Sequence, residues 1–182
     1  INKQYINKAI YYYELAAKQN DLNSLYNLGV IYESEQYIQR DIYKAIHYYS
    51  LAAKQDDPRS QFRLGVIYLM SKDDNRDLEK AFHFFILASN HNHPQAQYNL
   101  GLIYEKEDYV PRDINLAIHH YRIASLSDSN AKYKLGIIYY EKQMVSQAIN
   151  YFISASNQNH PHSQFYLGFF YYEGKHIEKN IQ

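Results

Sequence analysis

The chain has 182 residues, and its 19 lysines and arginines balance its 19 aspartates and glutamates, so the formal net charge is zero. Proteins that bind nucleic acid usually concentrate positive charge on one face, and the absence of a basic excess or of any run of like charges argues against DNA, RNA and anionic membranes as main partners. Without cysteine there is no disulfide framework and no thiolate metal site, and the longest apolar runs are too short to insert across a membrane.

A short phrase built around a glycine recurs along the whole chain. Gly29, Gly65 and Gly101 are 36 residues apart, and Gly136 and Gly168 continue the series. Each glycine follows a leucine and precedes, by three residues, a tyrosine. A fixed period of this size predicts a stack of similar small units.

A second marker, a pair of alanines seven residues apart, alternates with the glycine phrases. The pairs are Ala9 and Ala16, Ala45 and Ala52, Ala81 and Ala88, Ala117 and Ala124, and Ala148 and Ala155. Because a spacing of seven keeps residues on one helical stripe, each unit is predicted to hold two helices. The glycine phrase marks helix A and the alanine pair marks helix B. In chain order, a helix B at about 5–19 comes first and a helix A at about 161–172 comes last.

Capping residues support these helices. Asp41, Asp77 and Asp113 stand four residues before an alanine pair, where a carboxylate accepts amide hydrogens of the first turn. Proline suits the first turn of helix A, as at Pro58, Pro94 and Pro161. A helical glycine costs up to about 1 kcal/mol. We therefore expect the glycines and alanines to let the two backbones cross closely, with large aromatic side chains filling the space on either side.

The run from Ala96 to Tyr104, followed by Val110, Asp113, Ala117, Tyr121 and Ala124, resembles the Sel-one-like repeat family of tetratricopeptide-like helical hairpins. The resemblance extends over essentially the whole chain. It implies an all-α fold, an α/α superhelical solenoid of antiparallel helix pairs. The predicted organisation is a single repeat domain, 1–182, with a partial repeat at 1–22 (helix B), repeats at 23–58, 59–94, 95–129 and 130–161, and a partial repeat at 162–182 (helix A).

The loops between helices A and B depart from the family pattern. The family's first loop glycine is replaced by Glu35, Ser71 and Glu107, and Gly174 alone matches it, which favours a longer helix A. Asp74 replaces an apolar loop residue, so the second loop is expected to be less anchored.

The fourth unit is shorter than the others. Gly29 and Ala45 are 16 residues apart, but Gly136 and Ala148 are only 12 apart. The shorter spacing of 12 is that of plain tetratricopeptide repeats. Because Asn180 aligns with the capping aspartates, a further helix B is expected after the chain's last residues. Both ends are therefore interpreted as cut from a longer array.

The family resemblance implies that helix A lines the concave face of the superhelix, so polar positions on this helix become candidate partner-binding residues. The position two residues before each glycine holds Asn27, Arg63, Asn99, Lys134 and Tyr166, and the position four residues after it holds Glu33, Leu69, Glu105 and Tyr140. Asparagine both donates to and accepts from a peptide backbone, and arginine or lysine holds a carboxylate. Together they predict a groove for a protein or peptide segment.

The recurring aromatic and histidine positions are interpreted as structural rather than as ligand-binding sites. Two series, Tyr26, Phe62, Tyr98, Tyr133 and Phe165, and Tyr13, Tyr49, Phe85, Tyr121 and Phe152, are interpreted as core rather than as a stacking platform for bases or sugars. His47, His83 and His119 are predicted to lie about 10 Å apart on stacked helices, too far to share a metal ion. His91, His93, His160 and His162 fall in turns without a dense acidic cluster, so we expect no metal and no cofactor.

The sequence holds no phosphate loop, zinc-protease motif or nucleophile elbow, and we predict no catalytic residue. The predicted function is a scaffold or adaptor for protein partners. The family resemblance extends this to host contact by bacteria, with a secreted or host-directed bacterial protein preferred, and keeps a secretory-pathway quality-control adaptor as an alternative. A hydrolase or ligand-binding protein of β-lactamase type, using Ser129 and Lys132, is the alternative from another class. Self-association through the uncapped ends is a third possibility.

Overall fold

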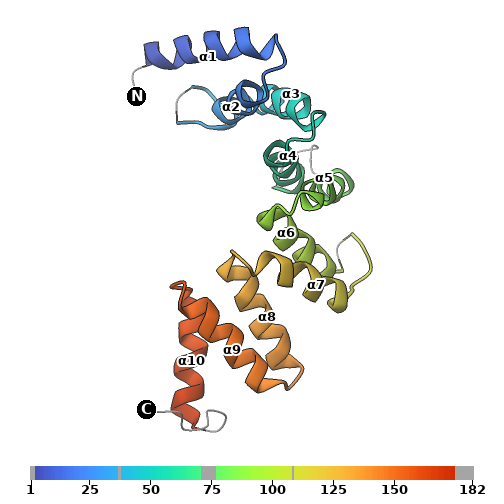
Figure 1. Cartoon of the computed structure of the whole chain (residues 1–182), viewed down its shortest axis with the longest axis vertical. Coiled ribbons are helices and arrows are strands. Elements are labelled where there is room, and N and C mark those ends of the chain that lie inside the picture. Colours follow the sequence, from blue (N-terminus) through green and yellow to red (C-terminus); the bar gives the residue numbers. More distant parts are fainter. Residues whose placement is uncertain (1–2, 37, 71–76, 108, 175–182) are drawn as a thin grey trace. The chain divides into compact units, whose positions relative to one another are not determined.

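The structure, a computed structural model, describes residues 3–36, 38–70, 77–107 and 109–174, and Figure 1 shows a succession of helices. The B helices are α1 (Lys3–Ala17), α3 (Ile42–Ala53), α5 (Leu78–Asn90), α7 (Ile114–Ala124) and α9 (Val145–Ser156). The A helices are α2 (Leu22–Glu33), α4 (Pro58–Met70), α6 (Pro94–Glu105), α8 (Ser129–Glu141) and α10 (Pro161–Glu173). Every helix and strand assignment within the described ranges is α-helical, which confirms the all-α architecture of alternating A and B helices. None of the described helices is long and apolar enough to cross a membrane.

The predicted start signals lie at the helix starts. Asp41 accepts a hydrogen bond from the Lys44 amide at 3.0 Å, Asp77 from the Lys80 amide, and Asp113 from two amides of the first turn of α7. Pro58, Pro94 and Pro161 are each the first residue of an A helix, where a missing N–H costs nothing.

The A helices carry a second set of caps that the sequence analysis missed. Asp21, Asp57, Asp128 and His160 each accept a hydrogen bond from an amide of the helix that follows. In three of these turns the residue just before the cap has a positive φ of 60–61°, namely Asn20, Asp56 and Asn159. Asparagine and aspartate tolerate this left-handed conformation, and the sequence signal is their recurrence immediately before three of the four caps.

The A helices are not lengthened by the loss of the family's loop glycine, so that prediction was wrong. Helices α2 and α6, which lead to Glu35 and Glu107, have 12 residues each, and α10, which is followed by Gly174, has 13. The backbone N–H of Asp41 donates to the Tyr32 carbonyl at 2.8 Å, and Asp113 bonds to Tyr104 in the same way. This hydrogen bond fixes the end of helix A without a glycine. Ser71, Asp74 and Asn180 lie outside the described residues.

The chain divides into two compact units, Ile1–Ala96 and Gln97–Gln182, each with its own core. The core of the first unit is centred on Leu28, Tyr49 and Leu64. That of the second unit is centred on Tyr121, Leu135 and Phe152. In both units a fully buried aromatic ring from a B helix lies beside the leucine of the glycine phrase, as the core interpretation of this ladder predicts.

The glycine positions are explained by those same rings. A Cβ atom built on each of the first four glycines would lie only 2.5–2.6 Å from ring atoms of Tyr49, Phe85, Tyr121 and Phe152, taken in order with Gly29, Gly65, Gly101 and Gly136. The ring therefore lies directly on the glycine rather than on either side of it. The alanine pairs of α3, α5, α7 and α9 are fully buried.

Candidate functional site

The nine candidate residues all lie on A helices, and eight of them are half-buried, with Tyr140 slightly more exposed. Two positions recur: two residues before the glycine and four residues after it. The second position of one A helix meets the first position of the next A helix in each unit, and a buried ring of the intervening B helix completes the contact. We call each such contact a junction and describe three of them.

The junction of the first unit joins α2, α3 and α4 through a carboxylate. Arg63 donates from Nε to Glu33 Oε2 at 2.9 Å, and its Nη2 lies 2.5 Å from the same oxygen. The buried Tyr49 hydroxyl also donates to Glu33 Oε2, at 2.8 Å. Glu33 is therefore held by two partners from two different helices.

Burial and charge set the protonation of this junction. Burial, reinforced by Glu33, raises the pKa of the Tyr49 hydroxyl, so this group is neutral at physiological pH. Burial works against the charged form of Arg63, yet its contact with Glu33 outweighs this and raises the pKa of the guanidinium. The Arg63 side chain is 36% exposed and the Glu33 side chain 15%, so Arg63 is the more exposed member of the pair.

The second unit contains the same arrangement between α6, α7 and α8. The Tyr121 hydroxyl donates to Glu105 Oε2 at 2.5 Å, and Lys134 Nζ lies 3.2 and 3.0 Å from the two carboxylate oxygens. Burial, followed by the hydrogen bond to Glu105, raises the pKa of Tyr121. A buried tyrosine thus again coincides with a glutamate and a basic residue.

The junction between α8, α9 and α10 is aromatic instead. Phe152, which lacks a hydroxyl, stacks on Tyr166 with ring centroids 4.8 Å apart and planes 5° apart. Tyr140 meets the Tyr166 ring edge-on at 6.3 Å. The ring position and the two A-helix positions therefore change together. Where the buried ring is tyrosine, the A helices supply a glutamate and a basic residue, and where it is phenylalanine, they do not. In the sequence, the repeat that contains Phe85 has uncharged residues at the two matched positions, Leu69 and Asn99.

These contacts give six of the nine predicted residues a structural role. Glu33, Arg63, Glu105 and Lys134 balance one another's charge inside their units, and Tyr140 and Tyr166 belong to an aromatic cluster. Sequence reasoning missed this pairing. The joint occurrence of tyrosine, glutamate and a basic residue at matched positions is the signal that reveals it.

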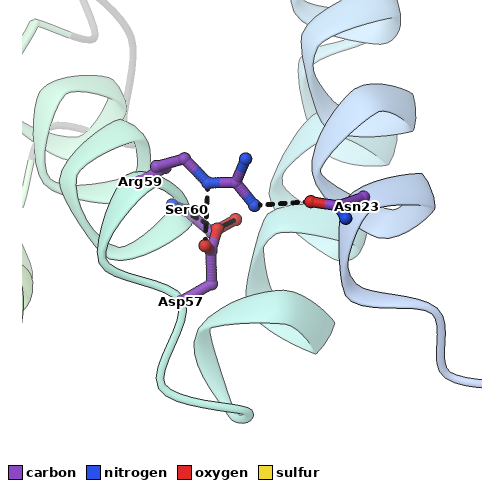
Figure 2. Close-up of polar contacts among 4 residues, drawn as sticks. All are labelled: Asn23, Asp57, Arg59 and Ser60. Atoms are coloured by element: carbon purple, nitrogen blue, oxygen red, sulfur yellow. Dashed lines mark hydrogen bonds and ion pairs between the residues drawn. The ribbon is translucent and has the colours of Figure 1, made fainter.

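A further polar cluster joins the N-terminal ends of α2 and α4 and was not predicted (Figure 2). Buried Asp57 accepts from the Ser60 amide at 3.0 Å, from Ser60 Oγ at 2.6 Å and from Arg59 Nε at 2.9 Å. Arg59 also donates to Asn23 Oδ1 at 3.1 Å and lies over the Tyr26 ring, 4.4 Å from its centroid. The cluster ties consecutive A helices together at the end opposite to Glu33.

The turn histidines act in packing and capping. His160 Nδ1 accepts from the Ser163 amide at 3.2 Å, and the His160 ring stacks on Tyr133. His93 stacks on Phe62 with ring centroids 4.6 Å apart. Burial lowers the pKa of both imidazoles, which keeps them neutral. No group of three or more histidine, aspartate or glutamate side chains is placed to hold a metal ion within the described part of the chain.

Ser129 and Lys132, the residues of the alternative hydrolase hypothesis, lie in the first turn of α8. Lys132 lines a shallow cleft of about 280 Å³ with Ser125, Asn150, Tyr151 and Ser154. Ser129 is not among the lining residues, so this cleft does not bring the two predicted groups together.

Comparison with known proteins adds the family. The model of the Sel1 repeat matches residues 4–21, 22–57, 58–93, 94–129, 129–160 and 161–182, six successive copies. No curated protein is similar enough to be counted as a relative.

Solved structures share the fold. A protective antigen present in uropathogenic Escherichia coli strains, described as displaying an SLR fold, is 24% identical with a TM-score of 0.84, over 94% of this chain and 38% of that protein. A Sel1 repeat protein from Oxalobacter formigenes is 24% identical with a TM-score of 0.83, over 96% of this chain and 74% of that one. An immunity protein from Pseudomonas aeruginosa is 19% identical with a TM-score of 0.57, over 86% of this chain and 58% of that protein.

Proposed function

The chain belongs to the Sel1 repeat family, and we propose that it is a non-catalytic scaffold that binds an extended protein segment along its A helices. Repeat scaffolds of this family bind protein partners, and stacked helical repeats suit the task because successive units offer the same surface again and again. The chain spans 38% of the E. coli antigen's length, so the proposal concerns the surface present in this chain.

The observation that carries the proposal is the recurrence of a partly exposed basic side chain held in place by a glutamate. Arg63 in the first unit and Lys134 in the second are each fixed by a carboxylate of the preceding A helix. A guanidinium has five N–H donors, and the contact with Glu33 engages only its Nε and Nη2 groups. Arg63 therefore keeps donors for a partner's carboxylate or carbonyl without giving up its internal pair.

Other predicted residues complete the surface of each unit. In the first unit Asn27 stands two residues before Gly29, with amide groups suited to a peptide backbone. In the second unit the exposed edge of Tyr140 adds an aromatic contact near Tyr166. A segment that combines acidic side chains with an extended backbone fits this chemistry best, and a fixed side chain loses little conformational entropy when it binds.

We extend the proposal to host contact by a bacterium. Its support is the E. coli structure, which is described as a protective antigen of uropathogenic strains. The Pseudomonas immunity proteins, which have the same type of fold at 19–21% identity, agree with a bacterial setting.

The test is a peptide array of extended segments graded in acidic content, followed by titration calorimetry with the best binder. Arg63→Gln and Lys134→Gln remove the basic groups of the two junctions. Arg59→Gln is the matched control, because it removes an arginine from the same helix, α4, that is also paired with an acid. We expect the two junction variants to weaken binding at least about tenfold, a loss of about 1.4 kcal/mol, and Arg59→Gln to bind like the parent chain.

Far-UV circular dichroism of each variant separates binding from folding. Equal affinity in the junction variants and the parent chain, with all variants folded, would exclude the A-helix surface. Equal weakening by Arg59→Gln would show that charge alone, rather than the junction, controls affinity.

A further inference from the structure

A cleft between two consecutive B helices recurs at the same place in both units. The α1–α3 cleft of the first unit has a volume of about 290 Å³, and the α7–α9 cleft of the second about 280 Å³. Five matched positions line both clefts. They hold Ala17, Leu25, His47, Tyr48 and Leu51 in the first unit, and Ser125, Lys132, Asn150, Tyr151 and Ser154 in the second. The repeat itself therefore produces the cleft.

The α7–α9 cleft lies within the array and is not an open end of it. Helix α6 precedes α7, and the Tyr121 ring of α7 packs on Gly101 of α6. Helix α10 follows α9, and Tyr166 of α10 stacks on Phe152 of α9. In the first unit α3 is followed by α4 and α5, yet the α1–α3 cleft is open. A further B helix in the array therefore does not close a cleft of this kind.

The two clefts differ in chemistry, because each apolar position of the first is polar in the second. Ala17, Leu25 and Leu51 are replaced by Ser125, Lys132 and Ser154. The change at Lys132 is the largest. Its equivalents in the three preceding A helices, Leu25, Gln61 and Gln97, are buried, whereas Lys132 is a half-buried cation.

The polar groups of the α7–α9 cleft have donors to spare. Among the residues that the structure describes, the side chains of Lys132, Asn150 and Ser154 form no hydrogen bond or ion pair. An ammonium group has three N–H donors and the amide of asparagine two. A partly buried charge without a counter-charge is unfavourable, so an anion that binds Lys132 is stabilised.

A stacked tyrosine pair beside each cleft carries opposite charges in the two units. In the first unit Glu14 accepts from the hydroxyls of Tyr32 and Tyr48, at 3.5 and 3.4 Å. In the second unit Arg122 stands at the position of Glu14 and donates to the Tyr139 hydroxyl at 2.5 Å. The acid beside the first cleft is thus replaced by a base beside the second.

The charge of the α7–α9 cleft is therefore positive. Tyr151, which lines the cleft, is in contact with Arg122, and the hydrogen bond to Tyr139 followed by this contact raises the pKa of the guanidinium. Helices α7 and α9 contain no acidic residue, and α8 contains only Glu141, at its last position. Asp128, the cap of α8, is bonded to the Asn130 amide.

We propose that the α7–α9 cleft binds a phosphate group, free or as a monoester, through Lys132 and Arg122, with neutral donors from Asn150 and Ser154. Pockets for whole small molecules span about 300–1,000 Å³, so a cleft of about 280 Å³ suits a single anionic group. A phosphate monoester carries about −1.5 to −2 charges at neutral pH. Two cations match that charge, whereas a carboxylate would neutralise only one of them.

The experiment is a titration of the ¹⁵N-labelled chain with inorganic phosphate at pH 7.5, followed by the backbone amide signals at constant ionic strength. Lys132→Gln removes the cation of the cleft and preserves the fold, because Gln61 and Gln97 occupy the same position. Arg122→Gln removes the second cation. Lys142→Gln is the matched control, since it removes a positive charge from the exposed C-cap of the same helix, α8.

We expect saturable shifts at Lys132, Asn150 and Ser154 in the parent chain and in Lys142→Gln. The dissociation constant should rise at least about tenfold in Lys132→Gln and in Arg122→Gln, since each loses a hydrogen bond to a charged group. Acetate, with one negative charge, should bind at least about tenfold more weakly than phosphate. A phosphoserine tripeptide identifies the source. Tighter binding than that of inorganic phosphate indicates a phosphorylated molecule, and weaker binding indicates the free anion.

Three results would overturn the proposal. The first is a parent chain in which phosphate causes no saturable shift at the cleft. The second is equal weakening by Lys142→Gln and Lys132→Gln, which would show that net charge alone attracts the ion. The third is acetate binding as tightly as phosphate. Lys134→Gln, which removes the A-helix cation paired with Glu105, should leave phosphate binding unchanged, so the test does not depend on peptide binding by the A helices.

Discussion

The α2–α3–α4 junction of the first unit and the α8–α9–α10 junction of the second each pack a buried aromatic ring of a B helix between two A helices, but with different neighbours. The first surrounds Tyr49 with a carboxylate and a guanidinium. The second places Phe152 against the rings of Tyr166 and Phe170, and Tyr140 packs edge-on against those two rings. The decisive difference is a single hydroxyl. Once the buried ring carries one, it needs an acceptor, and the acceptor's charge needs a basic partner.

This comparison shows that the three positions of a junction form one set. A residue such as Arg63 cannot be assigned to partner binding from its place on helix A alone, because it also neutralises Glu33. The same coupling means that substitutions should be compensated within a junction and not across junctions.

The largest effect is expected at the contact that both junctions share, the ring on the glycine. Gly136→Ala brings a Cβ to within 2.6 Å of the Phe152 ring, and Gly29→Ala brings one to within 2.5 Å of Tyr49. Overpacking of this kind should lower the free energy of unfolding by about 3 kcal/mol in each case. Urea denaturation followed by circular dichroism measures the loss. Gly168→Ala is the control and should be neutral or stabilising by up to about 1 kcal/mol, and equal losses at all three glycines would contradict the explanation.

Breaking the charged junction should cost slightly less. Glu33→Leu leaves the buried Tyr49 hydroxyl without its acceptor and Arg63 without its counter-charge, and should destabilise the chain by about 2 kcal/mol. Adding Tyr49→Phe and Arg63→Asn copies the set Leu69, Phe85 and Asn99 and should recover most of the loss. A triple variant as unstable as the sum of its single variants would show that the three positions are independent.

The free energy of unfolding is expected to depend on pH through the residue that precedes the buried ring in the sequence. Tyr48 and Tyr151 occupy this position in the two junctions compared, and His120 occupies it beside Tyr121, where burial lowers the imidazole pKa to about 4. The unfolded chain binds this proton near pH 6.5, so between pH 6.5 and 4 it holds more protons than the folded chain. Stability contributed by neutral His120 is therefore complete above pH 6.5 and is lost as the pH falls to 4. The loss is about 2 kcal/mol, because solvent screening of this partly exposed ring reduces the full linkage value of about 3 kcal/mol.

Denaturation curves at pH 7.5 and 4.5 check this expectation. His120→Tyr should reduce the difference between the two pH values, because tyrosine supplies a stacking ring that does not titrate there. An undiminished difference would assign the acid sensitivity to other groups, such as His93 or His160.

The smallest effects come from moving the single hydroxyl between the junctions. Tyr49→Phe removes one hydrogen bond but leaves Glu33 paired with Arg63, and should cost about 1 kcal/mol. Phe152→Tyr places a hydroxyl where no carboxylate lies, and should also cost about 1 kcal/mol. Double-mutant cycles with Glu33→Leu should give a coupling energy for Tyr49→Phe and none for Phe152→Tyr. Coupling between Glu33 and Phe152 would refute the idea of self-contained junctions.

Much of the fold was readable from residue spacing. The 36-residue period, the alanine pairs and the capping residues such as Asp41 and Pro94 identify helices through local rules of periodicity and capping. The end of helix A was not readable in this way. It depends on a hydrogen bond from the Asp41 amide to the Tyr32 carbonyl, between residues on opposite sides of a loop, whereas the missing loop glycine had favoured a longer helix A.

The candidate surface was predictable only in part. Helical register placed Arg63 and Lys134 at equivalent positions on A helices, and their role toward a partner stays a prediction. Register did not reveal that Glu33 and Tyr49, which are 30 and 14 residues from Arg63 in the chain, converge on it. A contact between three helices depends on how they pack, and spacing within one helix carries no information on it.

The sequence by itself determined the architecture, because helical periodicity and capping depend on local residue spacing, and the same spacing recurs in every repeat. The tertiary structure alone decided what the recurring residues do. Gly29 and Gly168 have the same sequence context. The Tyr49 ring packs on Gly29, whereas no atom lies within 4 Å of a Cβ built on Gly168. Arg63 and Tyr166 share a position, yet one pairs with a carboxylate and the other stacks on Phe152. The physical reason is that burial and the neighbouring helix, rather than the residue's place in the repeat, fix the partner available to each side chain.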